Sequence, residues 1–222
     1  MPPRPRPTQP VGLYDPEYEH DACGVAFVAR LDGEPSHETV RRAITALENL
    51  EHRGAAGADP NTGDGAGMLL QMPDDLMRGL FGAALPPAGQ YGVAVCFLPQ
   101  EEDRRAELER LLTETVEAEG QRVVAWRDIS VEKDYVGITA NYFAPYIKHL
   151  VVAAAPELAG DQDAFERKLY VIRRVAELVA GPDLAIPSFS SRTIVYKGML
   201  TASQLLGYYP AVSYTHLTLP TN

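Results

Sequence analysis

Hydrophobic and polar residues follow one another along the chain in patterns that predict both strands and helices. Short apolar runs rich in β-branched residues predict strands, and apolar residues spaced three and four apart predict helices. The predicted strands cover residues 23–31, 68–72, 91–98, 123–126 and 192–200. The predicted helices cover residues 36–51, 101–120 and 162–179. Because the two kinds of element are mixed without a regular strand–helix alternation, the pattern predicts an α+β fold.

Each predicted helix carries apolar residues at helical spacing, as expected of a helix packed against a core. Ser36 can cap the amino end of the first helix, and Gly120 can end the second. The apolar positions are Val40, Ile44, Leu47 and Leu50 in the first helix, Leu108, Leu111, Leu112 and Val116 in the second, and Phe165, Leu169, Ile172 and Leu178 in the third. Cys96 lies within the predicted strand at 91–98, so we expect it in the core.

A glycine-rich stretch separates the first helix from the strand at 68–72. It holds five glycines between Gly54 and Gly67 and includes the sequence NTGDGAG. One interpretation is a phosphate-binding loop, but the stretch lacks the Lys-Ser/Thr pair and the glycine spacing of such loops. We favour the alternative, a structural turn in which glycine allows tight bends and close packing of the backbone against the functional site.

Composition narrows the classes of partner. The 222 residues include 20 basic and 30 acidic side chains, and the resulting net charge of -10 disfavours binding to nucleic acid. No apolar run is long enough to span a bilayer, and the first residues lack the apolar core of a secretory signal. The two cysteines and five histidines form no disulfide framework and no metal-binding spacing. We therefore expect a protein of the reducing cytoplasm that binds neither nucleic acid nor membrane.

Cys23 has two interpretations. Residues 1–22 are rich in proline and then polar, which predicts a disordered or extended leader directly before it. Cys23 is either a small buried residue of the strand at 23–31 or a nucleophile released by cleavage between Ala22 and Cys23. In the second case the new α-amino group is a base within reach of its own thiol, an arrangement that suits amide hydrolysis through a thioester.

Four segments, in order, resemble one family. They are DACGVAFVA, the segment from PSHETVRRAITALENLEHRG to TGDGAGMLLQMP, FERKLYVIRR, and SFSSRTIVYKGML. Together they resemble the start of glutamate synthase large subunits, a class II glutamine amidotransferase domain of the N-terminal-nucleophile hydrolase type. The Cys-Gly start and LEHRG alone would indicate only the wider class. Another class II amidotransferase is therefore the alternative enzyme, and a non-catalytic regulatory domain that binds a small molecule is the alternative outside enzymes.

The resemblance implies a four-layer αββα sandwich in which Cys23 is the nucleophile and Arg53 and Gly54 have supporting roles. It implies that glutamine is the substrate and that the ammonia is passed to 2-oxoglutarate, in glutamate biosynthesis, by a later part of a longer polypeptide. FMN and an iron–sulfur cluster are implied for that later part, and no cofactor for the present chain. The rest of the large subunit and a small reductase subunit are the implied partners.

The resemblance ends before the family's segments that hold the substrate carboxylate and form the oxyanion hole. We therefore expect a leader at 1–22, an incomplete amidotransferase domain at 23–211, truncated on its carboxyl side, and a tail at 212–222. The tail resembles translated sequencing adapter, although its polar and apolar alternation would also suit an edge strand. We expect this chain alone to be inactive, because loss of one oxyanion-hole donor already lowers rates roughly a hundred- to a thousandfold.

Overall fold

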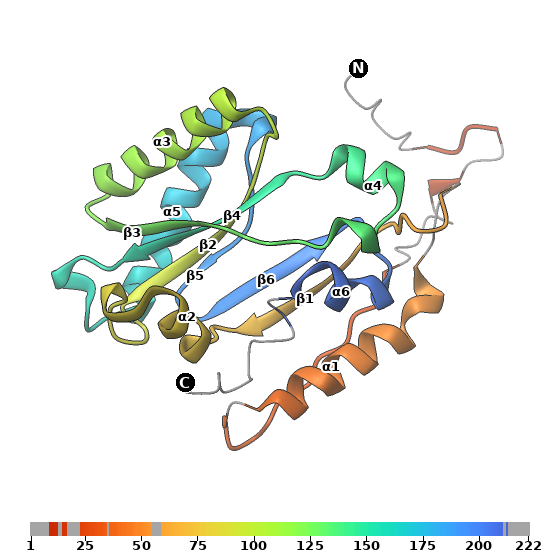
Figure 1. Ribbon diagram of the computed structural model, residues 1–222, viewed down its shortest axis with the longest axis horizontal. Coiled ribbons are helices and arrows are strands. Elements are labelled where there is room, and N and C mark those ends of the chain that lie inside the picture. The colour runs from red at the N-terminus through yellow and green to blue at the C-terminus, as the bar shows by residue number, and fades with distance from the viewer. Residues whose placement is uncertain are drawn as a thin grey trace.

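The computed structural model describes residues 9–12, 15–16, 23–34, 36–54, 59–210 and 212, with the backbone alone for Arg53. Its larger sheet has four antiparallel strands in the order β3-β4-β2-β5 (Figure 1). These strands are β2 (Tyr91–Leu98), β3 (Arg122–Asp128), β4 (Tyr146–Ala153) and β5 (Ala185–Ser190). β2 and β4 are buried over almost their whole length, so they form the centre of the molecule.

The second sheet consists of β1 (Ala66–Gln71) and β6 (Thr193–Gly198), which pair antiparallel. Ser191 and Arg192 are the only residues between β5 and β6, so the chain passes from one sheet to the other in a very short connection. Alternate residues of β1 and β6 face inward, among them Met68, Leu70 and Tyr196. The two sheets thereby enclose one apolar cluster between them.

Six α-helices surround the sheets in the described part of the chain. They are α1 (His37–Asn49), α2 (Asp74–Phe81), α3 (Glu102–Ala118), α4 (Ile138–Phe143), α5 (Gln162–Ala180) and α6 (Leu205–Tyr208). α3 and α5 cover the face of the four-stranded sheet that points away from β1 and β6, and a second apolar cluster lies beneath them (Figure 1). α1 lies beyond β1, with Val40 directed into the first cluster. No helix in the described ranges is both long and apolar enough to cross a membrane.

The mixed helix-and-sheet fold is confirmed, as are most predicted elements. α1 begins where Ser36 was expected to cap it, since Ser36 Oγ accepts a hydrogen bond from Glu38 N at 3.2 Å. Gly120 has a φ of 77° after α3, a conformation that suits glycine. Cys96 is fully buried in β2, as predicted. The predicted strands at 68–72, 91–98, 123–126 and 192–200 correspond to β1, β2, β3 and β6.

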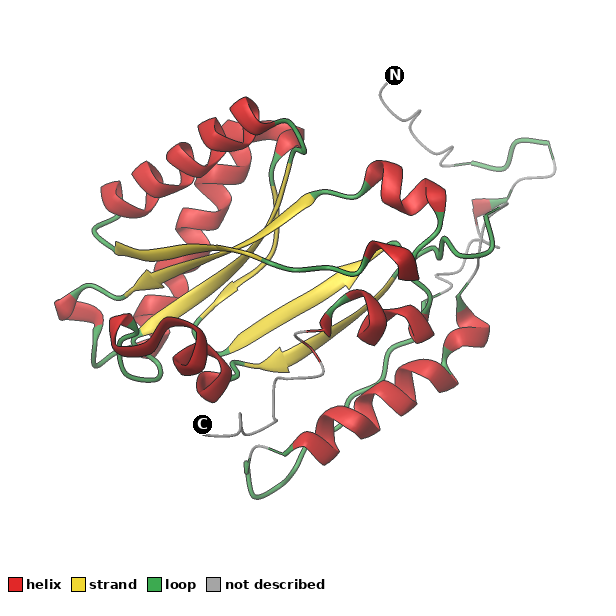
Figure 2. Cartoon of the chain, in the orientation of Figure 1, coloured by secondary structure: helices red, strands yellow, loops and turns green. Residues whose placement is uncertain are grey.

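The strand predicted for residues 23–31 is wrong. These residues form an extended loop, drawn green between β1 and α1 in Figure 2, and Phe27 is 92% exposed. Residues 28–30 lie beside β1, yet within the described residues β1 pairs with β6 alone. A β-strand forms only where a neighbouring strand pairs with its backbone N–H and C=O groups. An apolar, β-branched composition is therefore not sufficient to predict a strand.

A second correction concerns α5. Leu178 was grouped with Phe165, Leu169 and Ile172, but those three are buried whereas Leu178 is exposed. Leu178 lies six positions after Ile172, which is about 240° around a helix of 3.6 residues per turn, so the two side chains point to different faces. α5 therefore has apolar residues on two faces.

Candidate active site

Cys23 lies at the start of the described segment 23–34, and its side chain is exposed. The segment runs along α1 in the opposite direction (Figure 1), after which a turn closed by Gly33 N and Arg30 O leads back into the helix. Residues 28–30 share a hollow of about 270 Å³ with α1 and β1. The beginning of the segment therefore lies toward the end of α1, where the predicted supporting residues follow.

Arg53 and Gly54 come directly after α1. Arg53 ends the 3-10 turn η2 (Glu51–Arg53), which Gly54 N closes by donating to Glu51 O at 2.9 Å. A Cβ on Gly54 would lie 3.3 Å from Asp64 Oδ1, which is tighter than almost all real contacts. Gly54 thus packs against Asp64 within the glycine-rich stretch. No hydrogen bond among the described atoms joins Cys23 to Gly54.

The glycine-rich loop is a tightly packed structural turn, as the sequence predicted. A Cβ on Gly63 would come within 2.3 Å of the Leu200 carbonyl, and one on Gly67 within 2.6 Å of Lys197 Cβ. Gly65 has a φ of 143°, which side-chain-bearing residues rarely adopt. The loop therefore needs glycine in order to approach the segment that follows β6.

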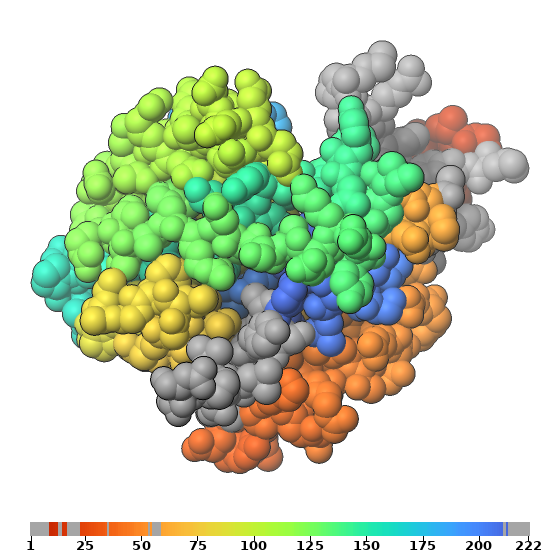
Figure 3. Space-filling model, in the orientation of Figure 1, coloured from red at the N-terminus to blue at the C-terminus, as the bar shows by residue number. Residues whose placement is uncertain are grey.

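Asp59 and Thr62 fasten the other side of this loop to α4. Asp59 Oδ2 accepts hydrogen bonds from Thr139 N at 3.1 Å and Thr62 Oγ1 at 2.8 Å, and Thr62 Oγ1 accepts from Ala140 N at 3.2 Å. These bonds, the one from the Thr139 backbone foremost, hold the pKa of Asp59 below its usual range. Figure 3 shows α4 standing out from the surface next to the orange loop.

Gln204 completes the arrangement from the carboxyl side. Its Nε2 donates to Asn61 O at 2.8 Å, and its Oε1 accepts from Thr201 N at 2.9 Å. The turn after β6 is thereby tied to the glycine-rich loop across 143 positions of sequence. Two of the four segments that carry the family resemblance meet at this place, one through LEHRG and TGDGAG and the other through YKGML.

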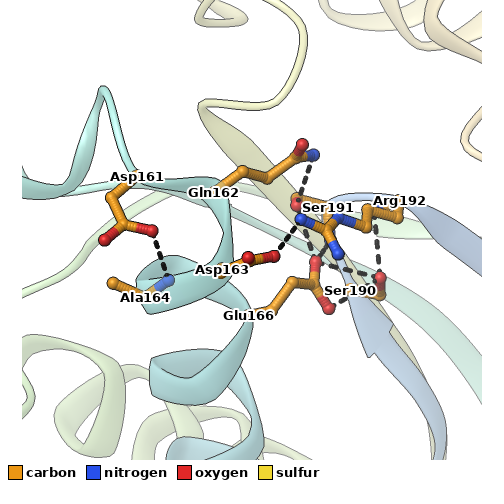
Figure 4. A network of polar contacts seen from close by, with 8 residues as sticks. All are labelled: Asp161, Gln162, Asp163, Ala164, Glu166, Ser190, Ser191 and Arg192. Carbon is orange, nitrogen blue, oxygen red and sulfur yellow. Dashed lines mark hydrogen bonds and ion pairs between the residues drawn. The ribbon is translucent and has the colours of Figure 1, made fainter.

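The segment FERKLYVIRR is joined to the start of SFSSRTIVYKGML by Glu166, as Figure 4 shows. Its carboxylate accepts hydrogen bonds from Ser190 Oγ at 3.0 Å and from Ser191 Oγ at 2.6 Å, and the Ser191 N–H also donates to it. The neighbouring Arg192 pairs with Asp163. FERKLYVIRR on α5 and SFSSR at the β5–β6 connection are therefore one polar cluster. Both segments carry the family resemblance, but nothing in their sequences indicates that they are in contact.

The two cysteines differ sharply in chemical availability. Burial raises the pKa of the Cys96 thiol, so that it stays protonated and unreactive in the core. Cys23, the other cysteine of the chain, is exposed. Of the two thiols, that of Cys96 is enclosed in the core and that of Cys23 is accessible to solvent.

Comparison with known proteins identifies the class. The family model "Glutamine amidotransferases class-II" matches residues 23–219, and the chain belongs to this family. It is homologous to glutamate synthase large chains. The "Glutamate synthase [NADPH] large chain" of Bacillus subtilis (strain 168) is 43% identical over 202 residues, which are 89% of this chain and 13% of the relative.

Two further relatives extend this similarity to other electron donors. "Ferredoxin-dependent glutamate synthase 2" of Synechocystis sp. is 38% identical over 194 residues, 86% of this chain and 12% of the relative. "Glutamate synthase [NADH]" of Schizosaccharomyces pombe is 38% identical over 206 residues, 89% of this chain and 10% of the relative. The chain therefore spans about an eighth or less of the length of these relatives.

Proposed function

We propose that this chain is the glutaminase part of a glutamate synthase, with Cys23 as the nucleophile. The observation that carries the proposal is that the family match begins at Cys23, which is also the exposed thiol. Relatives named for glutamate synthesis favour this assignment over another class II amidotransferase. In the longer polypeptide, the ammonia would be passed to 2-oxoglutarate.

The proposed reaction uses groups of Cys23 itself. After removal of residues 1–22, the α-amine takes the thiol proton and Sγ attacks the side-chain carboxamide carbon of glutamine. The C–N bond then breaks, the amine returns the proton to the leaving ammonia, and a thioester remains. Water attacks the thioester, which releases glutamate and restores the thiol. Arg53 and Gly54, at the end of α1, would support the backbone around the reacting carbon.

The proposal includes the finer architecture of the family. The order α3 and α5, four-stranded sheet, two-stranded sheet and α1 supports a four-layer αββα sandwich. Residues 1–22 would be the leader and the amidotransferase part would begin at Cys23 and include residues 23–211; the family match itself runs to residue 219. Flavin and the iron–sulfur cluster would belong to the rest of the polypeptide, which, with a small reductase subunit, is the proposed partner in a reducing cytoplasm. No group of three described His, Cys, Asp or Glu residues could hold a metal ion.

The test uses the natural full-length protein and two matched variants. Cys23→Ala is expected to lower glutamine-dependent glutamate formation at least about a thousandfold while leaving ammonia-dependent formation intact, because only the nucleophile is lost. Cys96→Ala, which removes the other thiol from the core, should retain the glutamine-dependent reaction in whatever fraction remains folded. Intact mass of the active protein should show that the chain starts at Cys23.

Two results would contradict the proposal. A Cys23→Ala protein that still uses glutamine would remove the nucleophile assignment, whereas an unchanged protein that binds glutamine without releasing ammonia would favour a binding domain without catalysis. A fully active protein that retains residues 1–22 would exclude the α-amine as the base.

A further inference from the structure

The outward face of α5 is unusually apolar for a solvent-facing helix. Leu178 is 74% exposed, Val179 66% and Tyr170 62%, and Val171 and Val175 are each 40% exposed. These five residues, here called the α5 outer patch, are spread over about half of the helix circumference, on the side away from the four-stranded sheet. The opposite face of α5 is packed on the four-stranded sheet. A helix that is apolar on both faces is typical of one buried between two bodies.

The charged residues of α5 leave the patch itself without a carboxylate. Glu166 turns toward Ser190 and Ser191, and Glu177 accepts a hydrogen bond from Ile186 N at 3.1 Å. Glu177 is only 14% exposed and also pairs with Arg174 at 2.7 Å. The charge of Arg174 is therefore compensated within the helix, and the patch is distinguished by its apolar side chains.

We propose that the α5 outer patch is the surface on which a later part of the same long polypeptide docks, through an apolar surface of its own. The inference rests on the proposed function in one respect, namely that the chain belongs to a longer synthase. The relatives are long enough to supply this body, since the matched region is only 10–13% of them. A domain of that size contacts its neighbours through a defined interface.

The position of the patch separates docking from chemistry. α5 covers the face of the four-stranded sheet that points away from β1, whereas the segment that begins with Cys23 runs along α1 and β1. A change on the α5 outer patch is therefore expected to leave the Cys23 thiol and its surroundings unaltered. This separation allows the interface to be tested without disturbing the glutaminase site.

The test measures thiol accessibility in the full-length protein. In Leu178→Cys, the rate of maleimide labelling in the native protein is compared with the rate for the same thiol in urea, with the peptide identified by mass spectrometry. Val179→Cys repeats the measurement on the same face. Glu48→Cys, on the exposed side of α1, is the matched control outside the patch. The expected result is labelling at least about tenfold slower than in urea for positions 178 and 179.

The outcomes discriminate the occupants. The proposal would be overturned if the thiols at positions 178 and 179 were labelled at nearly the rate seen in urea. It would also be overturned if their protection disappeared when the protein was diluted to monomers or when a small subunit was removed. Protection that persists in the monomeric large chain supports it. Glutamine- and ammonia-dependent activities are measured on the same samples. Rapid labelling at positions 178 and 179 with intact glutamine-dependent activity would refute the docking proposal and leave the proposed function standing. An error in the assignment of Cys23 as the nucleophile would show in the activity of Cys23→Ala and not in the labelling rates.

Discussion

His149 is a titratable residue held in an apolar environment. It lies on β4, almost fully buried, with Nε2 3.4 Å from the hydroxyl of Tyr196 on β6, and its Nδ1 has no hydrogen-bond partner among the described residues. Burial, and secondarily the positive charge of Arg127 on β3, lower the pKa of His149 to about 3. The imidazole is therefore neutral at neutral pH and connects the two sheets without a charge.

This environment predicts a specific loss of stability in acid. The unfolded chain protonates His149 below a pKa of about 6.5, whereas the folded protein does so only near 3. Between these values the unfolded state binds more protons, so the free energy of unfolding falls as the pH falls, by up to about 1.4 kcal/mol per pH unit. Above about pH 6.5 this contribution to stability is complete.

The measurement is urea unfolding of the intact amidotransferase domain between pH 7.5 and 4.5. His149→Leu should show a shallower dependence on pH than the unchanged protein, even if it is less stable overall. The control is His37→Gln, an exposed histidine at the start of α1, which should leave the dependence unchanged. Equal slopes for the unchanged protein and His149→Leu would contradict the burial of a neutral imidazole.

At the scale of elements, Glu166 joins α5 to the β5–β6 connection. Its carboxylate accepts from the two hydroxyls of Ser190 and Ser191 and from one backbone N–H. Hydrogen bonds to a charged acceptor contribute about 1.5–3 kcal/mol. Glu166→Gln removes the charge while keeping the shape of the side chain. We expect hydrogen-exchange protection of residues 190–194 in the full-length protein to fall about 5- to 100-fold.

The neighbouring pair provides the control for that experiment. Asp163 on α5 forms an ion pair with Arg192 in the β5–β6 connection, but the Asp163 side chain is 69% exposed. Exposed ion pairs contribute about 0–1 kcal/mol, so Asp163→Asn should change protection by less than about fivefold. If the two variants had equal effects, the Glu166 cluster would be no more than a surface contact.

Local signals explain which elements the sequence could predict. α1 and α3 have a cap or a glycine end and one apolar face, so their bounds could be predicted closely. β4 has the sequence YIKHLVVA and is buried on both faces, and it shows no regular alternation of apolar and polar residues from which a strand could be predicted. β5 contains Pro187, which argues against a strand except at an edge, and β5 is an edge strand. In contrast, residues 23–31 have strand composition but no pairing neighbour in the described part of the chain.

The same distinction applies to the candidate site. Cys23 could be singled out because its position between a polar leader and an apolar run suggests a chemical role by itself. The glycine-rich turn could be predicted because several glycines in a short stretch indicate a backbone that bends tightly or packs closely. The contacts of Asp59 with α4 and of Glu166 with Ser190 could not, because they join residues far apart in sequence and ordinary acidic residues carry no signal of their partners.

At the scale of the whole molecule, the two sheets differ in how well they are supported. The four-stranded sheet is covered on both faces by apolar clusters, whereas β1 and β6 form a sheet of only two strands. Leu69 of β1 and the nearby segment that contains Phe27 are exposed. Two paired strands are marginally stable by themselves, and exposed apolar side chains favour aggregation. We therefore expect further native sequence to be needed for a stable glutaminase.

Three proteins test this expectation: residues 1–211, residues 1–222, and the natural longer polypeptide. Ammonia release from glutamine and a cooperative urea transition of the amidotransferase part should occur only in the longest, where further sequence can cover the two-stranded sheet. Trp126 on β3 is the single tryptophan of the 222 residues, so its fluorescence reports the four-stranded sheet in both shorter proteins. Cys23→Ala in the longest protein should unfold cooperatively yet release no ammonia, which separates folding from chemistry. Comparable ammonia release by the 222-residue chain would instead show that these 222 residues already contain the complete substrate site.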